Sequence, residues 1–386
     1  MSAKDDPQGD LQDKADAAAG AGDVARALQL LEQAVIQAEA SPELWIKLSA
    51  MRRATGDVAG ALKAVERALA YAPLDFTALL SRAFLLERMG DIGAGEAFGH
   101  AIAQAPPDDR IPDLMRSAVE QARRKATEYQ SLMEERLSSA IPSNLGDLER
   151  RRTERFVSNA IRRTRHFHQE PTDFHYPGLP EIEFHDRDQF PELNAIEAAT
   201  ETIRGELEAL MAAEAAEMVP YIQYADHVPL AQWAELNKNR DWTAIHLLQN
   251  GCRVEVNARH CPVTMAVLAT LPQPNVLGAS PNAMFSLLAP RTHIPPHTGV
   301  ANTRLVCHLP LIVPPKCRFR VGNTTRAWEL GKAFVFDDTI EHEAWNDSDE
   351  LRVVLILDLW PPTLGKAERE AVAAVISAAG VSFNGA

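Results

Sequence analysis

A three-residue pattern near the N-terminus recurs at a constant spacing, and this period restricts the fold more than any other feature of the chain. The triplets lie 34 residues apart and read Gly22-Asp23-Val24, Gly56-Asp57-Val58 and Gly90-Asp91-Ile92. Each triplet separates two segments in which alanine, leucine and aromatic residues recur on one helical face. Prolines that can start or stop a helix lie near the ends of the units, at Pro42, Pro73 and Pro106. The period therefore predicts helix-turn-helix units that stack, because one unit alone cannot bury its apolar face.

A 34-residue helix-turn-helix period is similar to that of the tetratricopeptide repeat (TPR). We expect the repeats to cover residues 16–108, after a disordered N-terminus at residues 1–15 and before a helical connector at residues 109–170. Two functions are open for such repeats. They can form a concave groove that binds a peptide or protein partner, or a support that stacks or dimerises without a ligand.

Charge and composition exclude several classes of protein. The net charge of −14 disfavours non-specific binding to nucleic acid, and no apolar run approaches the roughly 20 residues of a membrane span. The N-terminus is polar and acidic and has no hydrophobic signal core, so we expect a cytoplasmic protein. Four cysteines do not form a disulfide framework in 386 residues. Cys252 and Cys261 flank a short loop and could bridge, but free thiols are expected.

From Tyr221 onward the chain is rich in short apolar segments that are typical of β-strands. We expect strands at Trp242–Leu248, Met284–Leu288, Thr303–Val313, Cys317–Val321, Thr325–Glu329, Ala333–Asp337 and Leu351–Leu359. This spacing predicts a sandwich or barrel rather than a parallel sheet. One helix at Glu192–Ala215 should lie against the outside of the sheet, and another at Lys366–Ala379 should close the domain. The fold class is therefore multidomain α + β, with a helical solenoid followed by a β domain and its flanking helices.

Two histidines and an arginine in this β-rich half have spacings that suit metal chemistry. His297 follows two prolines, which predicts a rigid turn after the strand at Met284–Leu288, and His342 is expected in a turn after the strand at Ala333–Asp337. Alternation places Arg352 on one strand face with Val354, Ile356 and Asp358. Imidazoles are suitable ligands for iron, and an arginine fork pairs with a carboxylate such as the distal one of 2-oxoglutarate.

At this point the sequence resembles the aspartyl/asparaginyl β-hydroxylases, a family of Fe(II)/2-oxoglutarate-dependent dioxygenases. The matching segments read HIPPHTGVANTRLVCHLPL, FDDTIEHEAWN and ELRVVLILDLW, with weaker likeness at YPGLP from Tyr176 and from Leu236 to Trp242. The resemblance covers roughly half of the chain. It implies a dioxygenase domain at residues 171–386 with a double-stranded β-helix, or jelly-roll, fold.

The resemblance also implies a role for individual residues. Only His297 and His342 would hold the metal, since Gly299 stands where most of the wider superfamily has a carboxylate. The cosubstrate would contact Arg352 and Ser286 at its distal carboxylate and His308 at its metal-side carboxylate, and Trp242 would line the pocket. Arg304 is a candidate for binding an anionic group of the substrate or the cosubstrate. No catalytic residue beyond these ligands is expected.

Val306 stands where some relatives have a second arginine, so the substrate need not be theirs. The implied activity is hydroxylation of an unactivated C–H bond with Fe(II), 2-oxoglutarate and O2. The acceptor could be a protein residue, a free amino acid or an acyl chain, and the repeats could recruit it.

Several other interpretations of these residues are open. His293, His297 and His342 could form a closed zinc site with Asp337 or Asp338, and the whole chain could be a non-catalytic TPR scaffold. Arg352 could pair with Asp358 instead of a ligand. Four further histidines lack the spacing of metal ligands and are expected to be surface residues, at His166, His168, His175 and His185.

Overall fold

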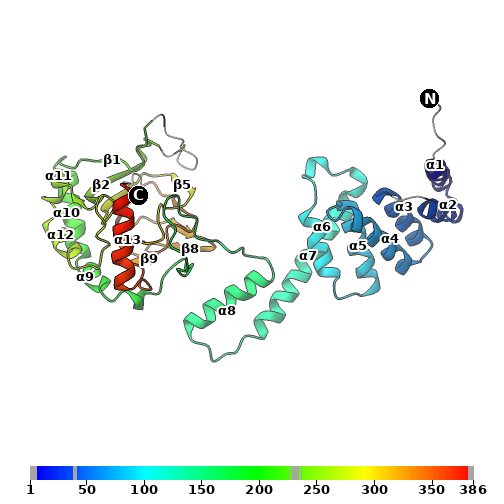
Figure 1. Ribbon diagram of the computed structural model, residues 1–386, viewed down its shortest axis with the longest axis horizontal. Coiled ribbons are helices and arrows are strands. Elements are labelled where there is room, and N and C mark those ends of the chain that lie inside the picture. Colours follow the sequence, from blue (N-terminus) through cyan, green and yellow to red (C-terminus); the bar gives the residue numbers. More distant parts are fainter. Residues whose placement is uncertain (1–6, 38–40, 226, 228–233, 236, 381–386) are drawn as a thin grey trace. The chain divides into compact units, whose positions relative to one another are not determined.

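The computed structural model divides the chain into two compact units, Met1–Thr164 and Arg165–Ala386. It describes residues 7–37, 41–225, 227, 234, 235 and 237–380, so Leu236 of the segment quoted above lies outside the described residues. Helices make up the described elements of the first unit, and β-sheets with flanking helices make up the second (Figure 1). The division lies a few residues before the expected start of the β domain at residue 171.

Three helical pairs form the repeats of the first unit. The pairs are α1 (Pro7–Gly20) with α2 (Val24–Gln37), α3 (Pro42–Ala54) with α4 (Val58–Tyr71), and α5 (Phe76–Met89) with α6 (Ala94–Ala103). Apolar clusters join successive pairs, so the helices stack as a solenoid. The predicted TPR-type architecture is confirmed.

Each recurring triplet forms the turn inside one helical pair. The glycines adopt positive φ values of 83°, 87° and 69° at Gly22, Gly56 and Gly90, a conformation that glycine reaches without side-chain strain. In the first two triplets the aspartate that follows accepts a backbone N–H three residues on, from Arg26 to Asp23 at 3.0 Å and from Gly60 to Asp57 at 2.8 Å. In the third, Asp91 accepts from Gly93 at 2.7 Å and Gly93 is the N-cap of α6. The 34-residue period therefore arises because each helical pair needs a glycine in its turn and an aspartate that accepts a backbone N–H at the start of the next helix.

The first helix begins earlier than the sequence indicates. The expectation of disorder at residues 1–15 is wrong for residues 7–15, which form most of α1. Leu11 and Ala15 pack with Leu30 and Leu31 of α2 in one apolar cluster. This segment has little apolar periodicity of its own, so its helix depends on tertiary packing. Residues 1–6 lie outside the described part of the chain.

The expected connector is helical over most of its length. After a short turn at Asp108–Arg110, α7 (Asp113–Ser139) packs on α6 through Val119 and Ala122, and α8 (Asp147–Ala160) follows it. Residues 165–170 belong to the second unit instead, because Gln169 pairs with Ile340 across a β-bridge.

Two antiparallel sheets build the second unit. The larger sheet has the order β1-β2-β4-β11-β6-β9 with β3 paired to β2, and the smaller has the order β5-β10-β7-β8. Their bounds are β1 Val219–Pro220, β2 Trp242–Gln249, β3 Cys252–Arg253, β4 Ala283–Leu288, β5 Thr292–His297, β6 Leu305–Ile312, β7 Cys317–Val321, β8 Thr324–Ala327, β9 Phe334–Phe336, β10 His342–Asn346 and β11 Arg352–Leu359. From β4 to β11 the chain changes sheet at every connection except β7 to β8, which gives the interleaved order of a jelly roll.

The two faces of the larger sheet bury different residues. One face packs against the short helices α9 (Leu193–Ala198), α10 (Thr200–Ala212) and α12 (Pro262–Leu268), as expected for this region. The other face and the smaller sheet share a second cluster that includes Met284, Phe319 and Ile356. α11 (Glu255–Ala258) contacts β2, and α13 (Lys366–Ala379) packs beside Phe174 and Trp360. A cavity between the two sheets is therefore lined by residues of this inner cluster.

Two strands of the smaller sheet differ from the sequence-based expectation. His297 ends β5 and His342 begins β10, whereas both are expected in turns. β5 contains Pro295 and Pro296, which an edge strand tolerates because its outer side needs no N–H donors. The proline-based interpretation as a turn is therefore wrong, although it locates the histidine correctly at a strand end.

Two further findings concern the cysteines and the helices. Cys252 and Cys261 are free, as expected, with Cys252 exposed and Cys261 buried. None of the helices in the described part of the chain combines the length and apolar character needed to cross a membrane.

Candidate active site

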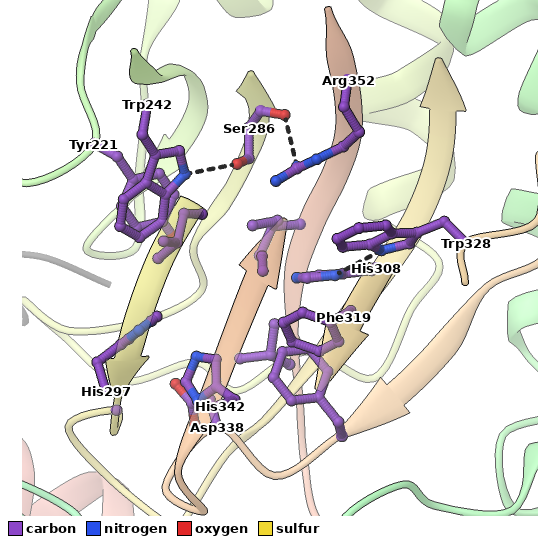
Figure 2. Close-up of a pocket in the computed structure, with 16 residues that line it drawn as sticks. Tyr221, Trp242, Ser286, His297, His308, Phe319, Trp328, Asp338, His342 and Arg352 are labelled. Carbon is purple, nitrogen blue, oxygen red and sulfur yellow. Dashed lines mark hydrogen bonds between the residues drawn. The ribbon is translucent and has the colours of Figure 1, made fainter. Parts of the chain in front are cut away.

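A pocket lies between the inner faces of the two sheets (Figure 2). Most of its lining is aromatic or aliphatic, and a few polar side chains project into it. The lining residues are Tyr221, Trp242, Ser286, Ile294, His297, Gly299, Val306, His308, Phe319, Trp328, Phe336, Asp338, His342, Ala344, Arg352 and Ile356. Of the predicted site residues, only Arg304 is missing from this set.

His297 and His342 are direct neighbours across the β5–β10 pair. Their Cα positions are register partners, and the centroids of the two rings are 4.1 Å apart. Nδ1 of His297 donates to the carbonyl of Pro295 at 2.7 Å, and Nδ1 of His342 donates to the carbonyl of Ile340 at 3.1 Å. A carbonyl can only accept, so each ring has its proton on Nδ1 and its lone pair on Nε2. This tautomer suits imidazoles that bind a metal through Nε2.

Burial keeps both of these imidazoles uncharged. Desolvation lowers the pKa of His297 to about 4, and burial with the neighbouring His297 ring lowers the pKa of His342 well below its usual value. The neutral form is the one that can coordinate a cation.

Arg352 brings a buried positive charge into the same pocket. It begins β11 on the face shared with Val354 and Ile356, as alternation predicts, and it is 2% exposed. Its Nη1 donates to the backbone carbonyl of Ser286 at 3.3 Å, its guanidinium lies 4.8 Å from the Trp328 ring, and its Nε has no hydrogen-bond partner. Desolvation lowers its pKa to about 10.

No carboxylate among the described residues lies within ion-pair distance of Arg352, which excludes the alternative pairing with Asp358. Asp358 instead accepts from Ser280 at 2.7 Å and from the backbone N–H of Asn282 at 2.8 Å. The guanidinium is therefore a buried cation that faces the pocket without a protein counter-charge.

Ser286 and Trp242 lie beside this arginine. The indole Nε1 of Trp242 donates to Oγ of Ser286 at 3.1 Å, and the Trp242 ring stacks on Tyr221 with centroids 4.0 Å apart. Because Oγ accepts this bond, its own proton is available to another acceptor. Figure 2 shows Ser286 between Trp242 and Arg352.

His308 lies on β6, opposite Ile356 of β11. Nε1 of Trp328 donates to Nδ1 of His308 at 3.4 Å. An indole can only donate, so His308 has its proton on Nε2. Burial and the nearby charge of Arg352 lower the pKa of His308 well below its usual value, which leaves a neutral donor in the pocket wall.

Arg304 does not reach the pocket, so the expectation that it contacts a substrate or cosubstrate is not supported. Its guanidinium lies 3.1 Å from a carboxylate oxygen of Asp338 and 3.4 Å from one of Asp358. It precedes β6 and is 3% exposed. Its charge neutralises two buried acids, a role that a single strand pattern cannot reveal.

Asp338 is the polar pocket residue whose place sequence reasoning missed. Its carboxylate occupies the space beside Gly299, where a Cβ would lie 2.1 Å from Oδ2. Burial raises its pKa to about 6, against the opposing effect of Arg304. The motif that begins at His297 has Gly299 where a carboxylate would otherwise stand. The carboxylate of Asp338, from the β9–β10 loop, occupies the space beside this glycine. The sequence feature that could have predicted this is the position of Asp338, four residues before His342. From the sequence alone this aspartate is a candidate only for a zinc ligand.

The predicted alternative of a closed zinc site through His293 is wrong. His293 lies on the opposite face of β5 from Ile294, with its Nε2 2.9 Å from Glu343 and its ring stacked on Trp345 at 4.9 Å. It does not line the pocket. Asp337 is also engaged elsewhere, since it accepts from the backbone and the hydroxyl of Thr339.

The fold and the pocket define a jelly-roll domain whose cavity combines two neutral imidazoles with a buried guanidinium. Residues 197–362 match the family model described as Aspartyl/Asparaginyl beta-hydroxylase, the family that the sequence motifs resemble.

Comparisons with individual proteins give the extent of the likeness. Human aspartyl/asparaginyl β-hydroxylase is 36% identical over 141 residues, which are 36% of this chain and 18% of that protein. The ornithine lipid ester-linked acyl 2-hydroxylase of Rhizobium tropici is 34% identical over 196 residues, which are 50% of this chain and 66% of that protein. The chain thus spans less than two thirds of the length of either relative. Among solved structures, the TPR domain of Sgt2 from Aspergillus fumigatus is 23% identical with a TM-score of 0.28, over 38% of this chain and 92% of that one.

Proposed function

We propose that the second unit is an Fe(II)/2-oxoglutarate-dependent hydroxylase that acts on an unactivated C–H bond. The observation that carries this proposal is the buried guanidinium of Arg352. Among the described residues no carboxylate lies within ion-pair distance of it, and it shares one pocket with the neighbouring imidazoles of His297 and His342. A buried cation without a counter-charge is costly, so it is best explained by an anionic ligand.

The donor set fits a ferrous ion. His297 and His342 would hold it through Nε2, because each Nδ1 is fixed by a backbone carbonyl. Two imidazoles leave coordination positions open for other ligands. Bound there, Fe(II) with 2-oxoglutarate and O2 would supply the oxidising power for hydroxylation.

The remaining polar residues orient the cosubstrate. Arg352 pairs with its distal carboxylate through the guanidinium fork, and Ser286 can donate its hydroxyl proton to the same group. The Nε2 proton of His308 is available to the metal-side carboxylate. Asp338 also lines the pocket, and its pKa of about 6 leaves it mainly anionic at neutral pH, 3.1 Å from the guanidinium of Arg304.

Aromatic side chains keep this cavity dry. Phe319, Trp328 and Phe336 pack around His308 and His342, with ring centroids between 4.8 and 6.3 Å apart. Excluding water strengthens the arginine–carboxylate pair and protects reactive species from side reactions.

The test is iron-dependent conversion of 2-oxoglutarate to succinate by the purified protein. His297→Ala and Arg352→Ala should each lower turnover by at least about 100-fold, since each removes a direct ligand. His293→Ala and Arg318→Ala are matched controls, because they remove the same side-chain types from the outer face of the smaller sheet, where they contact Trp345. Equal turnover in all four variants would favour the non-catalytic scaffold.

The acceptor and the repeats belong to the same proposal. Relatives named for aspartyl/asparaginyl residues and for a lipid acyl chain give two acceptor classes to assay, as peptide and as acyl lipid. We assign the TPR-type solenoid to recruiting the acceptor or its carrier. If so, residues 165–386 alone should retain 2-oxoglutarate turnover without acceptor but hydroxylate the acceptor more slowly than the full chain. Equal rates on the acceptor would instead favour a supporting role for the repeats.

A further inference from the structure

Three exposed side chains near the start of the second unit lie together and are not part of the pocket lining. Nδ1 of His166 is 3.2 Å from Nε2 of His168, Nε2 of His166 is 3.2 Å from Glu181, and Nδ1 of His168 is 3.2 Å from the other oxygen of Glu181. One ligand atom from each residue can be chosen so that all lie within 4.8 Å of one another. The prediction that His166 and His168 are surface residues is confirmed, whereas His185, also expected at the surface, is buried. Spacing could not show that the two exposed histidines meet a carboxylate, because Glu181 is 13 positions beyond His168.

The fold brings the cluster together by anchoring the residues between and after the histidines. Phe167 packs against the inner apolar cluster, under the guanidinium of Arg165 at 4.1 Å. Gln169 forms a β-bridge with Ile340, and its backbone N–H donates to Glu181 at 3.0 Å. Phe167 is directed into the domain while the two imidazoles face each other, with ring centroids 4.2 Å apart. The cluster is thus positioned by the backbone and by one anchored carboxylate.

We propose that His166, His168 and Glu181 form a second metal site, for a zinc-type divalent transition ion. Two imidazoles and one carboxylate are the donors that zinc accepts at bond lengths of about 2.0–2.2 Å, which separates neighbouring ligands on a tetrahedral ion by about 3.3 Å. The 3.2 Å approaches use different ring nitrogens of each histidine, whereas one ligand atom from each residue can be chosen so that the three lie within 4.8 Å of one another, which is somewhat wider than this separation. The side chains are 57%, 65% and 29% exposed, so they can rotate by the small amount that a shared ion requires, and water can complete the coordination.

An ion at this site fastens two segments that are distant in sequence. It closes the loop between His168 and Glu181, and a closed loop lowers the entropy of the unfolded chain. Nε2 of Gln169, next to the site, donates to Asp337, and the backbone N–H of Glu170 donates to Thr339 at 2.8 Å. A metal ion bound by His166, His168 and Glu181 would therefore hold residues 166–170 against the loop that precedes His342. This inference does not depend on the chemistry of the pocket.

The experiment measures bound Zn2+ per chain by equilibrium dialysis, using untagged full-length protein. The pocket histidines are first removed with His297→Ala/His342→Ala, so that only other sites are counted. This background should retain about one Zn2+ per chain at micromolar free metal, and Mg2+ should not compete, because nitrogen donors disfavour it. Adding His168→Ala, or separately Glu181→Gln, should lower affinity by at least about tenfold. His175→Ala, an exposed histidine of the same segment, is the matched control and should change nothing.

A second readout follows folding without using the pocket. Zn2+ should raise the thermal midpoint of the background protein, and His168→Ala should abolish that rise while leaving the metal-free midpoint unchanged, since the side chain is exposed. The inference is overturned if the background binds no Zn2+, if His168→Ala retains full stoichiometry, or if His175→Ala lowers binding as much as His168→Ala does.

Discussion

Two buried arginines of the β domain differ in whether a carboxylate neutralises their charge. This difference distinguishes an arginine that stabilises the fold from one that is available to a ligand. Arg304 lies between Asp338 and Asp358, so its charge is satisfied within the fold. Arg352 is equally buried, but its guanidinium donates to the Ser286 carbonyl and lies over the Trp328 ring, with no carboxylate of the described residues within ion-pair distance. A buried guanidinium without a carboxylate destabilises the ligand-free protein, and its lowered pKa of about 10 reflects the same cost. Under the proposed function, Arg352 binds the cosubstrate at the expense of the stability of the ligand-free protein.

Replacing Arg352 by methionine should stabilise the ligand-free protein while abolishing cosubstrate binding. Methionine keeps the packing against Trp328 and removes the desolvated charge, for an expected gain of about 1–3 kcal/mol in the free energy of unfolding. Urea unfolding with and without 2-oxoglutarate measures both effects, because only the parent protein should gain stability from the ligand. A less stable variant would show that Arg352 is structural.

His246 of β2 gives the domain an acid-sensitive position away from the pocket lining. Burial lowers its pKa from 6.5 to about 4, and its Nδ1 has no hydrogen-bond partner. The unfolded chain therefore binds a proton below pH 6.5 that the folded chain refuses until about pH 4. This contribution to stability is fully present above pH 6.5 and is lost as the pH falls through that window.

The variant His246→Leu should remove this part of the pH dependence. The difference in unfolding free energy between pH 7 and pH 4.5 should shrink by about 2–3 kcal/mol, the amount that a pKa shift of this size represents. Urea titrations at the two pH values give the difference directly. An unchanged difference would mean that other groups dominate acid unfolding.

At the residue scale the sequence predicted which side chains meet in the pocket. It did not predict which acidic residues neutralise the buried charge of Arg304. Motif spacing and strand alternation led to His297, His342 and Arg352, and the family resemblance added Ser286 and His308; all five line one pocket. The ion pairs of Arg304 depend on how β6, β11 and the β9–β10 loop are placed in space. Alternation along one strand predicts on which face of the sheet a side chain lies. Its partner on another strand can be predicted only when the pairing register of the two strands is known.

The repeat turns set the geometry of the solenoid at the level of helical pairs. Gly56 has a φ of 87°, so Gly56→Ala should destabilise the helical unit by about 1 kcal/mol through strain in the left-handed region. Gly99 within α6 is the matched control, because its Cβ would meet nothing within 4 Å. Gly99→Ala should stabilise the unit by about 0.5–1 kcal/mol, since alanine favours helices. Thermal unfolding of residues 1–164 measures both, and equal signs would contradict the assignment of the turn.

Strands with continuous apolar runs were predictable as elements, whereas the two strands that carry His297 and His342 were not. β2, β4, β7 and β11 lie within a few residues of their expected positions. β5 and β10 were missed because prolines, histidines and acidic residues hide their alternation. Their pairing is stabilised by neighbouring strands, so the signal lies in the sheet rather than in either segment alone.

The chain as a whole consists of two units with separate apolar cores, which predicts two separate unfolding events. Residues 1–164 contain the repeat clusters and residues 165–386 contain the two clusters on either side of the larger sheet. Each unit expressed alone should fold cooperatively, because each buries its own core. Differential scanning calorimetry of the full chain should resolve two transitions. A single transition that neither separate unit reproduces would show that the units fold only together.

The acid beside Gly299 limits how this domain can change in evolution or in the laboratory. Any side chain at position 299 would collide with Asp338, so a carboxylate can enter this corner from one chain segment or from the other but not from both. Installing an aspartate at 299 therefore calls for a simultaneous reduction at 338, and Arg304 would have to exchange one counter-ion for another. If position 299 is changed first, the two side chains collide. If position 338 is changed first, Arg304 loses one of its two counter-ions.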